Sequence, residues 1–386
     1  MAAAVSLAER EIPVTVFESG PALGGRARRI ISQGTELDNG QHILVGAYRE
    51  LFRLMRTVGV PHDAVRRVPL ELRYARKFSL RALWLPFPLD LLGGLLLARG
   101  LPFAERLGAV RFVAGLRSGL ESDEPVAELL RRHGQDGVIG HYLWRPLCVS
   151  ALNTPVEIAS SRAFLTVLRD ALLGGAGASD LVLPRVDLSR LFPDPAAAFV
   201  ARHGGEVRLR TPVENLSSLK DFSSVIVAVG PHQLKALLPG VADGYTYQPI
   251  YTCYLQYGDG ARLPFPMIGL ADGLVQWVFD RGALLGEKGR FACVISAQGD
   301  HQQMSQDELA ETCHRELNKN NLVNENPVWT RVIAEKRATI TCSVGRPAIE
   351  SKMPGVHIAG DYTDAEYPPT LEAAVRSGVR AARMIR

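Results

Sequence analysis

The sequence predicts an α/β protein in which a two-dinucleotide-binding-type domain is interleaved with an α+β substrate domain. Residues 2–18 have the pattern of a helix followed by a buried parallel strand. Residues 223–230 form a second apolar strand that ends in glycine, and residues 355–386 run strand, polar loop, helix. Because these elements lie at the start, middle and end of the chain, the domain that they build must be discontinuous.

The domain boundaries follow from the segments between these elements. At 386 residues the chain exceeds the usual size of one domain. We assign residues 1–60, 176–240 and 346–386 to the dinucleotide-binding domain, and residues 61–175 and 241–345 to the substrate-binding domain. Residues 245–300 are aromatic and β-rich, which predicts an antiparallel sheet. Helices are further expected within residues 40–60 and over residues 303–319.

Composition excludes several classes of function. The net charge of +4 is small for this length and does not indicate nucleic-acid binding. The five cysteines are scattered, without a C-x-x-C pair or a neighbouring histidine cluster, so we expect reduced thiols and no metal site. No charged segment followed by an apolar core opens the chain, so no signal peptide is indicated.

The first strand ends in a carboxylate, Glu18, and is followed by Gly24, Gly25 and Arg26. A carboxylate at this edge can accept hydrogen bonds from both ribose hydroxyls of an adenosine. Consecutive glycines let the backbone approach a pyrophosphate, and an arginine can pair with a phosphate. Glu18 alone could equally be an exposed acid at the end of a strand, but the combination with the glycines and Arg26 favours a dinucleotide site.

The glycine loop that opens such a fold has no counterpart in this sequence. A dinucleotide fold begins with a strand, G-x-G-x-x-G and a helix, with the acid about 20 residues further on. Here the helix begins at the first methionine. We therefore expect the first strand and its glycine loop to be missing from the chain, and cofactor retention to be weak.

A polar cluster, DNGQH, occupies residues 38–42 between two apolar residues. Asn39-Gly40 is a hairpin-turn signal, which is the simpler interpretation. The alternative is a loop that presents Asp38 and His42 to a ligand.

The end of the chain carries the strongest local feature. A strand ending in Gly360-Asp361 would place a carboxylate beside the hydroxyls of a bound cofactor. Thr370 and Leu371 then open a helix whose free N–H groups and dipole favour an anionic group. Thr370 also has the residue type of a simple helix N-cap, and the two roles are compatible.

Three segments of the sequence together resemble one superfamily of flavoproteins. They are ESGPALGGRARRI, ELDNGQHILVGAYRELFRLMRTVG and VHIAGDYTDAEYPPTLEAAVRSGVRAARMI. They are similar to the flavin-containing amine oxidases and phytoene desaturases. LDNGQHILVGAY, together with QWVFDRG at residues 276–282, most resembles the squalene-associated FAD-dependent desaturase branch, the hydroxysqualene dehydroxylases.

The resemblance implies a cofactor, FAD, and a set of residues that hold it. The implied residues are Glu18, Gly24, Gly25, Arg26, Gly360 and Asp361, with Thr370 and Leu371 near the isoalloxazine and Val213 in a strand whose backbone meets the adenine.

The resemblance also implies an activity, the reductive removal of the hydroxyl of hydroxysqualene, a long-chain isoprenoid lipid. Loss of an allylic hydroxyl needs a proton on the leaving oxygen and a hydride from reduced flavin. Our proton-donor candidates are Asp38 and His42. The alternatives are an isoprenoid desaturase of the phytoene type and, outside enzymes, a remnant or scaffold that retains FAD poorly.

Residues 83–98 are the most apolar stretch, and they are too short and too interrupted by proline and glycine for a spanning helix. With Arg81, Arg99 and Arg106 nearby, they suit a helix lying on an anionic membrane surface. A buried helix of the substrate domain is the alternative. We expect a cytoplasmic protein attached peripherally to the inner membrane; the oligomeric state stays open.

Overall fold

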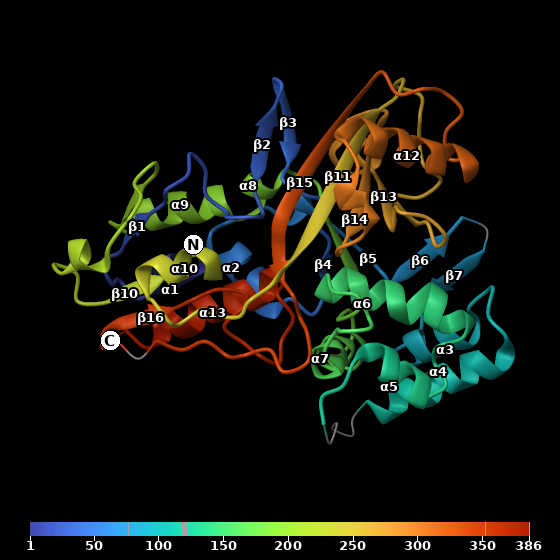
Figure 1. Cartoon of the computed structure of the whole chain (residues 1–386), viewed down its shortest axis with the longest axis horizontal. Helices are drawn as coiled ribbons and strands as arrows, with labels where there is room; N and C mark the ends of the chain where they lie inside the picture. Colours follow the sequence, from blue (N-terminus) through green and yellow to red (C-terminus); the bar gives the residue numbers. More distant parts are fainter. Residues whose placement is uncertain (76, 117–121, 352, 386) are drawn as a thin grey trace.

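The structure is a computed structural model that describes residues 1–75, 77–116, 122–351 and 353–385. Figure 1 shows three parts: parallel strands with helices around both termini, a large sheet covered by one helix, and a helical region below that sheet. Two long strands, β11 (Tyr247–Gln256) and β15 (Trp329–Ile340), run from the first part into the second. They therefore connect the parallel strands to the large sheet.

Two pairs of parallel strands carry the predicted dinucleotide-binding elements. Thr15 lies opposite Glu206 in one pair, and Val225 lies opposite Val356 in the other. Within the described residues the two pairs are separate ladders. Gly378 allows the first and last helices to touch, because a Cβ there would lie 3.0 Å from the backbone nitrogen of Ala3. The elements are α1 (Ala2–Ala8), β1 (Thr15–Phe17), α9 (Pro193–Arg202), β9 (Glu206–Arg208), β10 (Val225–Val227), α10 (Pro231–Leu237), β16 (Val356–Ile358) and α13 (Leu371–Arg383).

The predicted antiparallel sheet is confirmed and is larger than expected. It has seven strands in the order β15-β11-β14-β13-β12-β6-β7, and the last two come from residues 71–81. Strands β12 and β6 pair in parallel, with Gly269 opposite Tyr74. One helix, α12 (Gln306–Lys319), packs on β11 and β15. The remaining strands are β6 (Glu71–Tyr74), β7 (Phe78–Arg81), β12 (Met267–Gly269), β13 (Trp277–Asp280) and β14 (Arg290–Ser296).

The helical region contains the apolar stretch at residues 83–98. Only residues 89–96 of it are helical, and Leu91, Gly94 and Leu95 are buried there. No helix among the described residues is both long enough and apolar enough to cross a membrane. The helices are α3 (Leu89–Leu96), α4 (Phe103–Gly115), α5 (Val126–Arg132), α6 (Arg145–Leu152) and α7 (Ser161–Leu172), with a π-helical turn, η2 (Gly140–Trp144), before α6.

The helix predicted within residues 40–60 begins later than expected. It is α2 (Arg49–Thr57), and the residues before it include strand β4 (Leu44–Val45). A Cβ at Gly46 would lie 1.9 Å from the carbonyl oxygen of Gly177, so the turn at Gly46 lies directly against a distant loop. β4 and β5 (Val65–Val68) both pair with β8 (Leu181–Pro184). The proposed domain boundary at residue 60 thus falls within one small sheet.

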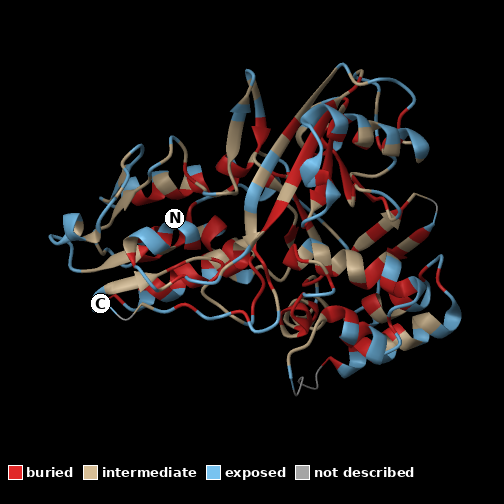
Figure 2. Ribbon diagram, in the orientation of Figure 1, coloured by how far each residue is buried: buried red, intermediate tan, exposed pale blue. Residues whose placement is uncertain are grey.

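Buried side chains gather on the faces of these sheets (Figure 2). The largest cluster lies between the seven-stranded sheet and the helical region and includes Trp144, Phe164 and Tyr254. A second cluster fills the space under α12, and a third lies between α1, α2 and α13.

Glu372 joins α2 to α13. Its two carboxylate oxygens accept hydrogen bonds from the backbone N–H groups of Glu50 and Leu51, at 3.1 and 3.0 Å. These donors lie in the first turn of α2, where no intrahelical partner exists. Glu372 is buried, and that burial raises the pKa of its carboxyl group. A side chain 322 positions away in sequence therefore caps α2.

Glu372→Ala should lower the free energy of unfolding by about 1–3 kcal/mol, because two N–H groups in a partly buried turn lose their acceptor. Urea unfolding followed by circular dichroism measures this. The control is Glu366→Ala, which removes an acid whose side chain is 65% exposed beside Arg162; a change below about 0.5 kcal/mol is expected there. Equal losses for the two variants would contradict the capping role.

Candidate functional site

The structure brings two predicted cofactor residues from opposite ends of the chain into contact. Arg26 Nη2 donates to Asp361 Oδ1 at 2.8 Å across 335 positions of sequence. Arg26 Nη1 donates to the carbonyl oxygen of Ala338 at 2.6 Å. The carboxylate of Asp361 raises the pKa of Arg26. The two charges are therefore held as a pair at the junction of the first and last segments.

The glycine turn before Arg26 leaves its backbone open. Gly24 and Gly25 have φ of 107° and 59°, in the left-handed region that glycine adopts without strain. A Cβ at Gly24 would lie 2.5 Å from the carbonyl oxygen of Ala27, whereas nothing lies within 4 Å of one at Gly25. Arg26 keeps 38% of its side chain exposed, but Asp361 only 6%. An open backbone beside a half-exposed guanidinium fits a pyrophosphate group.

Glu18 lies at the end of β1, as predicted. Its carboxylate accepts a hydrogen bond from Gly20 N at 2.7 Å, and its carbonyl oxygen accepts one from Thr211 N at 2.9 Å. The prediction that Val213 lies in a strand is wrong, because β9 ends at Arg208. Arg210 has φ of 53° and turns the chain towards the loop that follows Glu18. Contact between Val213 and an adenine stays a prediction.

The Gly360-Asp361 turn and the start of α13 are also as expected. Gly360 N donates to Ser377 Oγ at 2.9 Å, and a Cβ at Gly360 would lie 2.3 Å from the ring of Tyr362. Glycine is thus required where β16 meets α13. Thr370 Oγ1 accepts from Ala373 N at 3.2 Å and caps α13, whose first residue is Leu371. The helix N-terminus therefore follows the loop that begins at Asp361.

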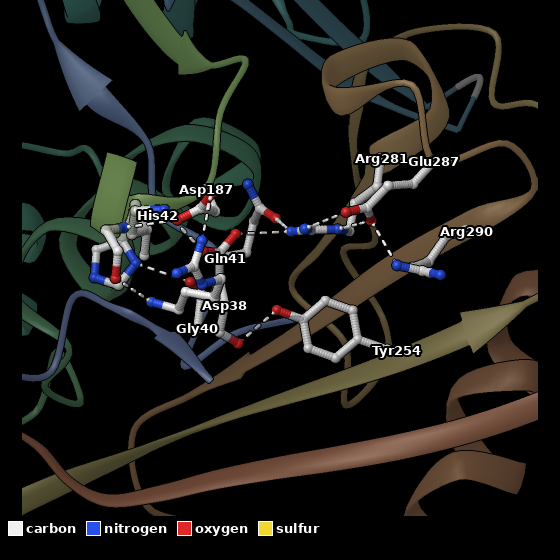
Figure 3. A network of polar contacts seen from close by, with 12 residues as sticks. Asp38, Gly40, Gln41, His42, Asp187, Tyr254, Arg281, Glu287 and Arg290 are labelled. Carbon is white, nitrogen blue, oxygen red and sulfur yellow. Dashed lines mark hydrogen bonds and ion pairs between the residues drawn. The ribbon is translucent and has the colours of Figure 1, made fainter. Parts of the chain in front are cut away.

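Asp38 is the most constrained member of residues 38–42, which we call the signature loop (Figure 3). Its carboxylate accepts from Leu188 N at 2.9 Å and from Arg281 Nη1 at 3.0 Å. Its carbonyl oxygen accepts from the Tyr254 hydroxyl at 2.8 Å. Burial raises the pKa of Asp38, and the Arg281 charge opposes that rise. Each carboxylate oxygen is thus occupied by a protein donor.

The role of Arg281 is not apparent from the sequence, although the residue lies in the QWVFDRG segment. Its side chain is 1% exposed. Nε and Nη2 donate to the two carboxylate oxygens of Glu287, at 2.6 and 3.0 Å. Burial alone would lower the pKa of Arg281, but the carboxylates of Glu287 and Asp38 hold it above its ordinary value. The available signal was an arginine that closely follows the apolar residues Trp277, Val278 and Phe279.

Asn39 connects the signature loop to a predicted cofactor residue, whereas His42 is bonded within the loop. Asn39 Nδ2 lies 3.0 Å from the carbonyl oxygen of Arg26 and 3.1 Å from Glu335 Oε2, and donates to both. His42 Nδ1 lies 2.9 Å from the carbonyl oxygen of Gly40. Burial lowers the pKa of His42, and the nearby Arg26 charge lowers it further. The imidazole is therefore held in its neutral form at neutral pH.

The arrangement combines an anion-binding region with a buried polar loop. Arg26, the glycine turn and the N-terminus of α13 suit the phosphates of a dinucleotide. The signature loop adds the carboxylate of Asp38 and an imidazole, His42, that lies near enough to Arg26 for that charge to lower its pKa. The roles of Asp38 and His42 as proton donors stay predictions.

Comparison with known proteins places this geometry in context. A family model described as flavin containing amine oxidoreductase matches residues 1–386. A protein described as hydroxysqualene dehydroxylase from Sinorhizobium fredii is 26% identical over 411 residues, which cover 99% of this chain and 94% of that protein. One of the same description from Rhodopseudomonas palustris is 26% identical over 414 residues, with 100% and 95% covered.

A solved structure supports the predicted fold class. An oxidoreductase from Methanosarcina mazei superposes with a TM-score of 0.72 at 14% identity, covering 99% of this chain and 97% of that one. At this identity the likeness shows the fold alone, and it confirms the predicted dinucleotide-binding type with an interleaved second part.

Replacing His42 should change how stability depends on pH. The ordinary pKa is 6.5 and the folded value is lower, so the unfolded chain takes up a proton first as the pH falls. His42 therefore costs stability below about pH 6.5, and His42→Gln removes that cost. Between about pH 7.5 and 5.5, wild type should lose roughly 1 kcal/mol relative to the variant in urea unfolding. A difference that stays constant with pH would refute the burial argument.

Proposed function

Because the chain belongs to the family of flavin containing amine oxidoreductases, we propose that it uses FAD to convert hydroxysqualene to squalene. Membership of this family means that the chain is a flavin-dependent oxidoreductase, in agreement with the predicted cofactor, FAD. The choice of substrate is supported by two relatives of that description, whose similarity extends over essentially the whole chain.

One observation carries the proposal. The two segments that resemble the dehydroxylase branch, LDNGQH and QWVFDRG, are far apart in sequence, yet they meet through the Asp38–Arg281 ion pair at 3.0 Å. Figure 3 shows this contact in a network that also holds Gln41 and Glu287. Segments recognised separately are thus parts of one buried structure next to Arg26.

Different residues of the chain would bind the cofactor and donate the proton in the proposed reaction. The substrate hydroxyl takes up a proton and leaves as water, and a hydride takes its place on carbon, so the substrate is reduced. When bound, the reduced cofactor supplies that hydride. Arg26, Asp361 and the Gly24-Gly25 turn hold the cofactor, with Glu18 on the ribose. Asp38 and His42, in the signature loop, are the two candidates for the proton donor.

Incubation of the FAD-loaded protein with hydroxysqualene and a chemical reductant, followed by lipid analysis, tests the proposal. We expect squalene to accumulate. A parallel incubation with phytoene and an oxidant tests the desaturase alternative. Desaturated product there, without squalene in the first reaction, would overturn the proposed substrate. Asp361→Ala is the matched variant: it should retain less FAD, because Arg26 loses its buried partner.

A peripheral position on the inner face of the membrane is part of this proposal. Among the residues that the structure describes, seven of the 17 exposed large hydrophobic ones lie within residues 84–107, on and around α3 and α4 (Figure 2). Trp84 is 86% exposed and Phe103 is 70% exposed. The exposed charges between residues 78 and 111 are basic, because both acids there, Asp90 and Glu105, are partly buried. The seven are Trp84, Leu85, Leu89, Leu96, Leu97, Phe103 and Leu107.

This surface suits an anionic bilayer that holds the lipid substrate. Trp84→Ser combined with Phe103→Ser should weaken binding to phosphatidylcholine vesicles containing phosphatidylglycerol by about 10-fold or more. Co-sedimentation measures this, and raised salt should weaken binding by wild type. Val328→Ser, at a residue 75% exposed elsewhere, is the control and should bind as wild type does. Absence of wild-type binding would refute the membrane surface.

A further inference from the structure

Arg281 makes contacts in two directions from a fully enclosed position. On one side Nη1 donates to Asp38 Oδ2 at 3.0 Å and to Gln41 Oε1 at 3.1 Å. On the other side Nε and Nη2 donate to Glu287. One guanidinium therefore holds two residues of the signature loop against the large sheet (Figure 3).

The geometry requires an arginine. A guanidinium is planar and carries donors on three nitrogens, so it can bond two groups on opposite edges at once. A lysine keeps the charge but has a single nitrogen, which cannot reach Glu287 and Asp38 in the same two-sided arrangement. Charge alone therefore does not replace Arg281.

Arg281 and its partner Glu287 are themselves held in place by further contacts. Asp280 accepts from Ala283 N at 2.9 Å and caps the short helix α11 (Arg281–Leu285), at whose start Arg281 lies. Glu287 is held from its far side by Arg290 Nη1 at 3.0 Å. The guanidinium lies 5.3 Å from the ring of Tyr254, whose hydroxyl donates to the Asp38 carbonyl. Movement of the signature loop relative to the sheet would break several of these contacts together.

The signature loop is bonded to the predicted cofactor region through Asn39. Asn39 follows Asp38 directly, and its side-chain amide donates to the carbonyl oxygen of Arg26. Arg26 in turn pairs with Asp361. A shift of Asp38 would thus displace the neighbour that supports Arg26.

We propose that Arg281 is a positioning residue that sets the signature loop against the flavin site, with Asp38 as its anchor. In this arrangement both carboxylate oxygens of Asp38 accept hydrogen bonds from protein donors, so Asp38 holds the loop in place instead of protonating the substrate. The inference rests on the proposed flavin site and not on the identity of the substrate.

The test compares Arg281→Lys with Arg290→Lys in the full chain loaded with FAD. Both variants keep the charge and disturb Glu287, but only Arg281 reaches the signature loop. We expect Arg281→Lys to change the visible circular dichroism of bound flavin and to lower kcat about 10-fold or more with KM little changed. Arg290→Lys should leave both readouts close to those of wild type.

A second pair of measurements distinguishes an anchoring role of Asp38 from a role as proton donor. If Asp38 acts through Arg281, then Asp38→Asn added to Arg281→Lys should cause little further loss, and the alkaline limb of the kcat–pH profile, where a proton donor loses its proton, should survive in Asp38→Asn. Additive losses, or loss of that limb, would overturn the proposal. Gln41→Ala removes one loop contact and spares the ion pair, so it gives a milder change in the same direction if Arg281→Lys does not fold.

The flavin signal keeps this test independent of the substrate. If wild type does not reduce hydroxysqualene, the proposed function fails, whereas the dichroism of bound FAD still reports on the loop. An Arg281→Lys protein with lower thermal stability but an unchanged flavin spectrum would show a purely structural role and overturn the inference.

Discussion

The rest of the candidate site depends on the pairing of one buried cation, Arg281. A charge removed from water must find partners, and leaving it or its acid unpaired typically costs about 3–5 kcal/mol. Asp38, Gln41 and Glu287 supply those partners from two distant parts of the chain. Such a pair adds little net stability over apolar packing, but it excludes other arrangements of the same segments. Here it specifies how the signature loop meets the large sheet.

Polar contacts between residues far apart in sequence also join the first and last segments of the chain. Arg26 pairs with Asp361, and Glu372 caps the helix that begins at Arg49. Arg346 is buried and donates to the carbonyl oxygens of Asp364 and Tyr367, in the loop that leads from Asp361 to α13. Directional polar contacts between distant residues thus align a domain that is discontinuous in sequence, while the apolar clusters supply the bulk of its stability.

These contacts explain how one chain can serve a charged cofactor and an apolar substrate. Arginines, glycine turns and a helix N-terminus gather on the parallel strands, where phosphates would bind. The apolar surface of α3 and α4 lies on the other part of the molecule, on the helical region below the large sheet (Figure 1). The signature loop lies where the segment of Arg26 is bonded to the large sheet. Under the proposed function, the flavin and the lipid substrate would meet next to this loop, whose titratable side chains are Asp38 and His42.

Some of this could be predicted from the sequence because it depends on neighbours in the chain. The apolar strand before Glu18, the left-handed glycines before Arg26, and the Thr370 cap of α13 are local, and each was found as expected. The tertiary structure decided which charges pair, that α2 begins only at Arg49, and that Val213 lies beyond the end of its strand. Arg281 shows the reason most clearly. Its motif is visible in the sequence, but its role depends on Asp38, 243 positions away, and such a contact is set by how the sheets pack and not by local propensity.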